Sequence, residues 1–351
     1  MSQPLGVLPA QFDIPALERY LQLEVPGLSG SVQVEQLKGG QSNPTFLLTS
    51  ERGRYVLRKK PGGTLLPSAH AVEREFKVIS ALQQTGVPVP RTLCLCEDPT
   101  VIGTSFYVME YVEGRIFWDP ALPDLTRTER TALYDDINRV VAALHCVDPS
   151  AVGLHDFGGH GGYMKRQIGR WGKQYTSSSG GHPIEALDRL MEWLPARIPV
   201  DESVSVVHGD LRIDNLIVHP TEPRVVAVLD WEISTLGDPL ADLSYHMITW
   251  DLRPDEFRGM AGLDLSRLGI PQADEYLARY CERVGRTLVP SDVWDFYAVY
   301  NLFRLAAMLH GIGRRAESGT AADSAAYALG TKARQIADIG WRWARERLAA
   351  S

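Results

Sequence analysis

A polar segment between apolar runs constrains this chain more than any other feature. The segment HGDLRIDN occupies residues 208–215, with apolar residues on both sides, and a later apolar run ends at Asp230. Short apolar runs bounded by polar turns predict buried strands. Asn215 and Asp230 then present side-chain oxygen atoms, which are the ligands that Mg²⁺ takes in proteins. A plain polar turn between two strands is the alternative interpretation.

This segment resembles the catalytic region of the aminoglycoside phosphotransferase and choline kinase families, where H-G-D-x-x-x-x-N precedes an apolar strand that ends in Asp. The resemblance implies an ATP-dependent kinase, in which the protein aims a hydroxyl and neutralises phosphate charge. It implies that Asp210 is the catalytic base and that Asn215 and Asp230 hold Mg²⁺. His208 is expected to shape the loop rather than to act as a base.

The order of the predicted elements favours an α+β fold, protein-kinase-like and two-lobed. A helix is expected over residues 13–23. The pattern of residues 31–112 predicts the order β-β-β-α-β-β. The strands are expected at 31–38, 45–49 and 54–59, the helix at 69–84, and two strand pieces within 101–112. The remainder is mainly helical, beginning with a long helix over 126–145. We expect an N-terminal helix and linker over 1–30, a small β-rich N-terminal lobe over 31–112 and a larger helical C-terminal lobe over 113–351.

Two backbone segments are expected to contact the nucleotide. The glycine-rich turn at 39–45 allows backbone N–H groups to approach phosphates, which makes Ser42 and Asn43 candidates. An ordinary hairpin turn is the alternative. The resemblance also places a hinge at 109–112, where backbone groups of Glu110 and Val112 would pair with adenine.

A basic residue of the third strand, paired with an acid of the following helix, is expected to hold the phosphates. Related enzymes carry a lysine at the place that Arg58 occupies, and Lys59 follows as the alternative. Alternation along a strand places Arg58 and Lys60 on one face and Lys59 on the other. The helical partner is Glu75, which fits the family position better than Glu73. A solvated basic edge is the other interpretation of these cations.

Three further stretches narrow the resemblance to one branch of the family. They are GGQSNPT at 39–45, VLRKKP with LLPSAH at 56–70, and VIGTSFYVME at 101–110. They look like the phosphotransferase branch fused to, or encoded beside, acyl-CoA dehydrogenases, and the match covers about residues 30–345. The resemblance implies a hydroxyacyl-CoA or a related hydroxy acid as acceptor. No dehydrogenase domain is present in the sequence, so the stand-alone form is expected.

The segment GDPLADL at 237–243 also matches this branch. The resemblance implies that Asp242 supports the catalytic loop by accepting hydrogen bonds from its backbone. Asp238 precedes a predicted helix, and its side chain is expected to cap that helix.

The C-terminal part of the chain is basic in an otherwise acidic protein. From residue 300 onward there are eight Arg and Lys residues against four acids, in a chain of net charge −7. Arg304 and Arg315 are eleven residues apart, so a helix would put them on nearly one face, where they could bind an anionic substrate. A salt-bridged surface helix is the alternative.

Charge and hydropathy exclude several classes. The net negative charge argues against a nucleic-acid partner. No apolar run approaches the length of a membrane span, and the N-terminus lacks the features of a signal peptide, so a cytoplasmic location without a membrane partner is expected. Two alternatives stay open. One is an antibiotic phosphotransferase, and the other is a nucleotide-binding scaffold that partners an acyl-CoA dehydrogenase.

Overall fold

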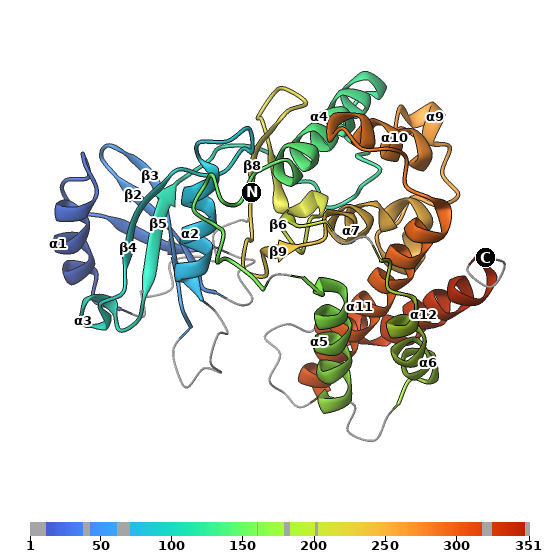
Figure 1. Ribbon diagram of the computed structural model, residues 1–351. Helices are drawn as coiled ribbons and strands as arrows, with labels where there is room; N and C mark the ends of the chain where they lie inside the picture. The colour runs from blue at the N-terminus through green and yellow to red at the C-terminus, as the bar shows by residue number, and fades with distance from the viewer. Residues whose placement is uncertain are drawn as a thin grey trace. The chain divides into compact units, whose positions relative to one another are not determined.

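The computed structural model describes residues 12–37, 43–61, 71–159, 161–178, 183–200, 203–317 and 325–347, without the side chains of 325–329. The chain forms two compact units (Figure 1). The β-rich unit combines residues 1–116 with 214–234, and the helical unit combines 117–213 with 235–351. Residues 214–234 thus belong by their contacts to the β-rich unit, whereas the sequence predicts them in the helical lobe.

The β-rich unit is built on a five-stranded antiparallel sheet with the order β1-β2-β3-β5-β4. Its strands are β1 Gln33–Gln36, β2 Thr45–Ser50, β3 Gly53–Lys59, β4 Thr92–Cys96 and β5 Phe106–Glu110. Its helices are α1 Ile14–Glu24, α2 Val72–Leu82 and α3 Pro99–Ile102. A separate hairpin consists of β7 Leu216–Val218 and β8 Val225–Val228.

The two faces of this sheet carry different chemistry, because side chains alternate along each strand. One face packs on α1 in an apolar core that includes Leu17, Leu57 and Val108. The opposite face carries Arg58 and Tyr107 toward Glu75 of α2. Figure 1 shows the sheet between α1 and α2. The alternation predicted for β3 therefore holds.

The last two strands of the sheet differ from the prediction. Residues 99–102 form the short helix α3 rather than a strand piece, and the fifth strand is β4 at 92–96. Asp98 caps α3 by accepting a hydrogen bond from the Thr100 N–H, and Pro99 starts the helix. This capping outweighs the strand preference of Val101 and Ile102.

The β7–β8 hairpin is attached to the rest of the β-rich unit by main-chain contacts. Arg115 and Val218 exchange two backbone hydrogen bonds, and the Val228 N–H donates to the Pro88 oxygen at 2.9 Å. Gly114 is required at this junction, since a Cβ there would lie 2.3 Å from Ile217 and 2.4 Å from the Val218 oxygen. These contacts hold Asp230, which follows β8, in the β-rich unit.

The helical unit is organised around α11, Ser291–Glu317, which packs against α5, α7 and α12. Its other elements are α4 Arg127–His145, α5 Tyr163–Ser178, α6 Glu185–Trp193, the 3-10 helix Leu194–Arg197, β6 Ser205–Val207, β9 Thr235–Gly237, α7 Pro239–Asp251, α8 Pro254–Phe257, α9 Leu265–Leu268, α10 Ala273–Arg283 and α12 Ala325–Glu346. The predicted helix over 126–145 is confirmed as α4, with Thr126 and Glu129 forming a capping box.

The apolar core of the helical unit surrounds α11 and includes Tyr297, Phe303 and Leu187. Asp238 caps α7 by accepting from the Leu240 N–H at 2.9 Å, as predicted. Within the described parts of the chain, every helix is too short or too polar to cross a membrane.

Candidate functional site

The expected catalytic loop begins where β6 ends in the helical unit. His208 and Gly209 follow the strand, and Gly209 adopts φ +84°, which favours glycine. Asp242 of α7 accepts the His208 N–H on Oδ2 and the Gly209 N–H on Oδ1, both at 2.8 Å. One buried carboxylate therefore fixes two consecutive peptide groups directly before Asp210. This is the contact expected of Asp242.

Asp242 is itself held from the opposite side by α4 and α10. His145 Nε2 lies 3.2 Å from Asp242 Oδ2, and His145 Nδ1 lies 2.8 Å from the hydroxyl of Tyr280. Burial alone would raise the pKa of Asp242, but the hydrogen bond with His145 and the hydrogen bond from the His208 N–H hold this pKa below its usual value. The carboxylate that carries the loop therefore stays ionised at neutral pH.

Asp210 lies on this loop with its side chain 15% exposed. Its carboxylate is 3.4 Å from Arg212 Nε and accepts a hydrogen bond from Tyr245 of α7. Burial opposes ionisation, yet the charges of Arg212 and Arg304 hold the pKa of Asp210 below its usual value. The geometry provides an ionised oxygen that can orient a hydroxyl.

His208 and Arg304 complete the support of this loop. The Asp210 N–H donates to His208 Nδ1 at 3.1 Å, which is a loop-shaping contact. Arg304 of α11 donates to the Gly209 carbonyl oxygen and packs over Tyr245, 4.4 Å from the ring centre. Arg304 is 4% exposed, whereas Arg315 is exposed on the last turns of α11. The two arginines thus lie in different environments, and Arg304 contacts the loop backbone.

In the β-rich unit, Arg58 links two acidic residues. Its Nε lies 2.8 Å from Glu75 Oε2, and one terminal nitrogen lies 2.8 Å from Asp230 Oδ1 and 3.8 Å from Glu232. Burial alone would lower the pKa of Arg58, but Glu75 and the other acidic neighbours raise it above its usual value. Arg58 is therefore a permanent cation that connects β3, α2 and the segment after β8.

Glu75 has a full set of donors although its side chain is only 1% exposed. Asn43 Nδ2 donates to Oε1 at 2.6 Å, and the Tyr107 hydroxyl donates to Oε2 at 3.1 Å. Burial raises the pKa of Glu75, and the Arg58 guanidinium and Asn43 amide oppose that rise. Asn43, one of the two expected residues of the glycine-rich turn, thus contacts the acid that pairs with Arg58. Ser42 lies outside the described residues.

The neighbouring charged residues take other partners. Glu73 forms an ion pair with Lys60, the residue that follows the last residue of β3. Lys59 is buried on the face of β3 opposite to Arg58, where its ammonium lies 5.8 Å from the centre of the Phe12 ring. Burial lowers the pKa of Lys59. The structure therefore brings Arg58 and Glu75 together and leaves Lys59 and Glu73 apart from that pair.

Asp230 has a main-chain conformation that is uncommon for a non-glycine residue, with φ +65°. The preceding Leu229 N–H donates to the Asn215 carbonyl oxygen at 2.8 Å, so that Asn215 lies beside this turn. The Asp230 side chain is 41% exposed, and Oδ1 accepts from Arg58. Among the described residues no donor lies within hydrogen-bonding distance of Oδ2.

These residues fit a Mg²⁺ ion that completes its shell with phosphate and water oxygens. Asp230 supplies a carboxylate with one oxygen away from Arg58, and Asn215 supplies an amide. Mg²⁺ is usually held by one or two protein oxygens together with substrate phosphates. In the described part of the chain no group of three His, Cys, Asp or Glu side chains could hold a metal by itself, so the fit depends on a phosphate ligand.

The expected hinge residues lie at the end of β5. Glu110 is its last residue, and its N–H donates to the Arg91 oxygen at 2.8 Å. Val112 follows two residues later, after Tyr111, whose N–H donates to the Arg54 oxygen at 3.3 Å. Adenine contacts by Glu110 and Val112 stay a prediction.

Three supporting residues were not predicted from the sequence: His145, Tyr245 and Tyr107. His145 lies four residues after Val141 on the buried face of α4, so its spacing could have marked it. Tyr245 lies three residues after Asp242 on α7, which places both toward the catalytic loop. Tyr107 faces Arg58 across the β3–β5 pair, a register that the sequence alone does not define.

Comparison with known proteins identifies the family. The profile of the phosphotransferase enzyme family matches residues 33–300. Mouse acyl-CoA dehydrogenase family member 10 is 45% identical over 94% of this chain and 31% of its own length. The probable acyl-CoA dehydrogenase IBR3 of Arabidopsis thaliana is 42% identical over 93% of this chain and 42% of its own length. The chain thus spans less than half of each of these relatives.

Solved structures agree with this match. A Ralstonia eutropha protein provisionally named an aminoglycoside phosphotransferase is 48% identical, with a TM-score of 0.87, over 95% of this chain and 99% of that one. An aminoglycoside phosphotransferase solved with ADP and hygromycin B is 17% identical, with a TM-score of 0.60, over 93% and 98%. The second likeness shows the shared kinase-like fold alone. With the family profile covering most of its length and a relative 48% identical over 95% of it, this chain belongs to the phosphotransferase enzyme family.

Proposed function

We propose that this chain is an ATP- and Mg²⁺-dependent kinase that phosphorylates a hydroxyl of a small molecule, with a hydroxyacyl-CoA as the acceptor class. The observation that carries the proposal is Asp210. Its carboxylate has a lowered pKa, and it follows directly on two peptide groups that Asp242 holds. In a phosphotransferase, an ionised and immobilised carboxylate is suited to orient and deprotonate the acceptor hydroxyl.

In the proposed reaction, the γ-phosphoryl group of ATP moves to the acceptor hydroxyl. Asp210 accepts the proton of the acceptor hydroxyl while that oxygen forms a bond to the γ-phosphorus of ATP. The bond between this phosphorus and the β–γ bridging oxygen breaks, and ADP leaves with the electron pair. Asn215 and Asp230 would hold Mg²⁺, which would supply charge neutralisation at the phosphates. Asp210 then loses its proton to solvent, for which its low pKa is favourable.

The nucleotide is assigned to the residues of the β-rich unit. Arg58 is a permanent cation beside Asp230, which supports a role at the phosphates. Glu75 holds Arg58 from the other side, so that the guanidinium is oriented before nucleotide binds. Family members of the same fold have been solved with ADP and with AMP-PNP, which supports ATP as the donor.

The acyl-CoA acceptor is supported by two observations. Two relatives that match more than nine tenths of this chain, at 45% and 42% identity, carry acyl-CoA dehydrogenase names. The C-terminal part of the chain has an excess of basic residues, which suits the phosphates of CoA and disfavours polycationic aminoglycosides. A free hydroxy acid is the simpler acceptor of the same class.

The test is ATP consumption with Mg²⁺ across a panel of acceptors. The panel contains 3- and 4-hydroxyacyl-CoAs, the corresponding free hydroxy acids, choline and kanamycin, and Asp210→Asn is the control. We expect ADP release that depends on a hydroxyacyl-CoA and is lost in the control. Release stimulated only by kanamycin would establish the antibiotic alternative instead. Nucleotide binding without turnover on any acceptor would favour a scaffold that partners a dehydrogenase.

A further inference from the structure

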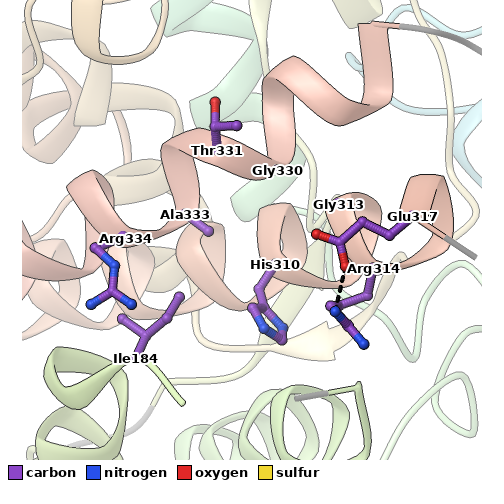
Figure 2. A pocket seen from close by; sticks show the side chains of 9 residues that line it. All are labelled: Ile184, His310, Gly313, Arg314, Glu317, Gly330, Thr331, Ala333 and Arg334. Atoms are coloured by element: carbon purple, nitrogen blue, oxygen red, sulfur yellow. Dashed lines mark hydrogen bonds and ion pairs between the residues drawn. The ribbon is translucent and has the colours of Figure 1, made fainter. Parts of the chain in front are cut away.

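A cavity of about 290 Å³ lies in the helical unit where α11 and α12 meet (Figure 2). It is lined by the last turns of α11, the first described turns of α12 and the residue before α6. Its lining includes Ile184, His310, Gly313, Arg314, Gly330 and Arg334. None of the expected catalytic or nucleotide residues lines it, so it is a separate site within the helical unit.

The cavity exists because the two helices touch through glycines. A Cβ added to Gly330 would lie 2.3 Å from the Gly313 Cα, and one added to Gly313 would lie 2.8 Å from the Gly330 Cα. The helix backbones are therefore in direct contact at this point, without side chains between them. The larger side chains before and after the contact form the walls, and the glycines leave room at the base.

The walls carry an excess of positive charge. Two arginines, Arg314 and Arg334, stand against one acid, Glu317, among the lining residues. Glu317 pairs with Arg314. Among the described residues no acid lies within ion-pair distance of Arg334. Figure 2 shows Arg334, His310 and Arg314 along one side of the two helices, with Ile184 next to Arg334.

The helix that borders this region adds to the positive charge. α5 packs against α11 and carries no acidic residue, but it exposes four basic side chains: Lys165, Arg166, Arg170 and Lys173. His310 is bound to this helix through Ser178 Oγ, 3.2 Å from its Nδ1, and it packs edge-to-face on Tyr175. The buried imidazole is thereby oriented. One acid, Asp188 of α6, hydrogen-bonds with Tyr175 and reduces the positive charge of this region, but the basic residues of α5 and of the lining outnumber it and favour an anion.

The distance from the catalytic loop is set by α11 itself. Arg304 donates to the Gly209 carbonyl oxygen, next to Asp210. Arg314 lies ten residues further along the same helix, which corresponds to about 15 Å at 1.5 Å per residue. A ligand that places a hydroxyl at Asp210 therefore needs a spacer of roughly this length to reach the cavity.

We propose that the cavity binds a phosphate group of the acceptor, at the end opposite to the hydroxyl that is phosphorylated. The proposal rests on the proposed function in taking Asp210 as the point of transfer. An acyl-CoA has the required form, because its pantetheine arm separates the acyl chain from the phosphates. A short hydroxy acid cannot span both places. Through Arg334, the cavity thus selects long acceptors that carry a phosphate. The ion pair with Glu317 holds the Arg314 side chain in place.

The test measures the binding of CoA itself, which needs no hydroxyl and no turnover. Isothermal titration calorimetry compares wild type, Arg334→Gln and Arg334→Lys. Arg342→Gln is the matched control, because Arg342 is also exposed on α12 but does not line the cavity. We expect the affinity for CoA to fall about tenfold or more in Arg334→Gln, since a charge-assisted contact to phosphate is lost. Arg334→Lys recovers part of the affinity, and Arg342→Gln equals wild type.

Two truncated ligands identify the group that is bound. Pantetheine lacks all phosphates and is expected to bind weakly and equally to wild type and Arg334→Gln. Dephospho-CoA separates the 3′-phosphate from the diphosphate: a loss of the Arg334 effect assigns the 3′-phosphate to the cavity, and a retained effect assigns the diphosphate. The proposal is overturned if wild type does not bind CoA, if Arg334→Gln binds it as tightly as wild type, or if pantetheine binds as well as CoA.

The failure of this proposal is distinguishable from the failure of the proposed function. If CoA binding depends on Arg334 but no hydroxyacyl-CoA is phosphorylated, the cavity assignment stands and the kinase assignment falls. If a hydroxyacyl-CoA is phosphorylated with the same KM in wild type and Arg334→Gln, the kinase assignment stands and the cavity assignment falls.

Discussion

The two units fix their functional carboxylates in different ways. In the β-rich unit a side chain holds Asp230: Arg58 reaches its Oδ1, and the carboxylate is 41% exposed. In the helical unit the main chain before Asp210 is held, because Asp242 accepts two consecutive N–H groups, and the Asp210 side chain is only 15% exposed. One acid is thus placed by an ion pair, and the other by the backbone of its loop.

This difference corresponds to the two proposed roles. A residue that ligates Mg²⁺ needs an accessible oxygen, and an ion pair from one side leaves the second oxygen of Asp230 accessible. A residue that aims at a hydroxyl needs a fixed position, because small displacements of a catalytic group reduce the rate strongly. The β-rich unit thus offers charge for binding, whereas the helical unit offers a fixed geometry.

The largest expected effect on stability comes from Arg58→Met. This change leaves Glu75 and its buried carboxylate without their cation, and breaking a buried ion pair costs about 3–5 kcal/mol. Urea denaturation measures the free energy of unfolding. Arg58→Lys is the matched control, since it keeps the charge and is expected to lose less. A free energy of unfolding within error of wild type for Arg58→Met would show that the pair does not organise the β-rich unit.

A smaller loss is expected for Asp242→Asn. The amide keeps one acceptor for the loop but turns a donor toward the other N–H, which costs about 1–3 kcal/mol. We expect kcat to fall while ATP affinity is unchanged, because Asp242 supports the loop of Asp210 alone. Asp338→Asn, an exposed acid on α12, is the control. A loss of ATP affinity as large as the loss of kcat would contradict the separation of the two units.

The same variant has a defined pH dependence. The folded-state pKa of Asp242 is lowered, so its contribution to stability is fully present above the unfolded pKa of about 3.9 and is lost as pH falls through the lower folded value. The difference in unfolding free energy between wild type and Asp242→Asn should therefore be constant near neutral pH and shrink below about pH 4. A difference that grows in acid would refute this assignment.

The smallest effect on stability is expected for Asp230→Asn. The Asp230 carboxylate is 41% exposed, and ion pairs of solvent-exposed groups contribute roughly 0–1 kcal/mol. The variant should therefore unfold almost as wild type does while losing Mg²⁺-dependent ATP binding. Thermal unfolding with and without ATP and Mg²⁺ measures both. A loss of stability as large as that of Arg58→Met would show that Asp230 is mainly a structural residue.

The residues of the catalytic loop and the fold class of the chain were predictable, because the sequence patterns that indicate them are local. The segment 208–215 carries its own strand boundaries and polar residues, and the N-terminal alternation of strands and one helix predicts a β-rich lobe. The cap of α7 by Asp238 was predictable for the same reason. Family membership is now established, whereas the roles assigned to Asp210, Asn215 and Asp230 stay predictions.

Other features depend on contacts between distant segments and could not be read from the sequence. Residues 214–234 join the β-rich unit through hydrogen bonds of Val218 and Val228 with partners more than a hundred residues away. The sequence favoured Arg58 over Lys59 and Glu75 over Glu73. The contact of Tyr107 with Glu75 could not be predicted, because it depends on the register between β3 and β5. The short helix α3 shows that two capping residues override the apolar pattern that follows them.

The central claim, that the two units divide the work, is tested most directly by titrating ATP and Mg²⁺ into Asp210→Asn and Asp230→Asn and by measuring the turnover of each. We predict that both variants lose turnover, with kcat of Asp210→Asn reduced about 10²–10⁴-fold. We also predict that Asp210→Asn binds ATP as wild type does, whereas Asp230→Asn loses the Mg²⁺-dependent part of that affinity. Wild-type turnover in Asp210→Asn, or a loss of its ATP affinity as large as that of Asp230→Asn, would contradict the claim.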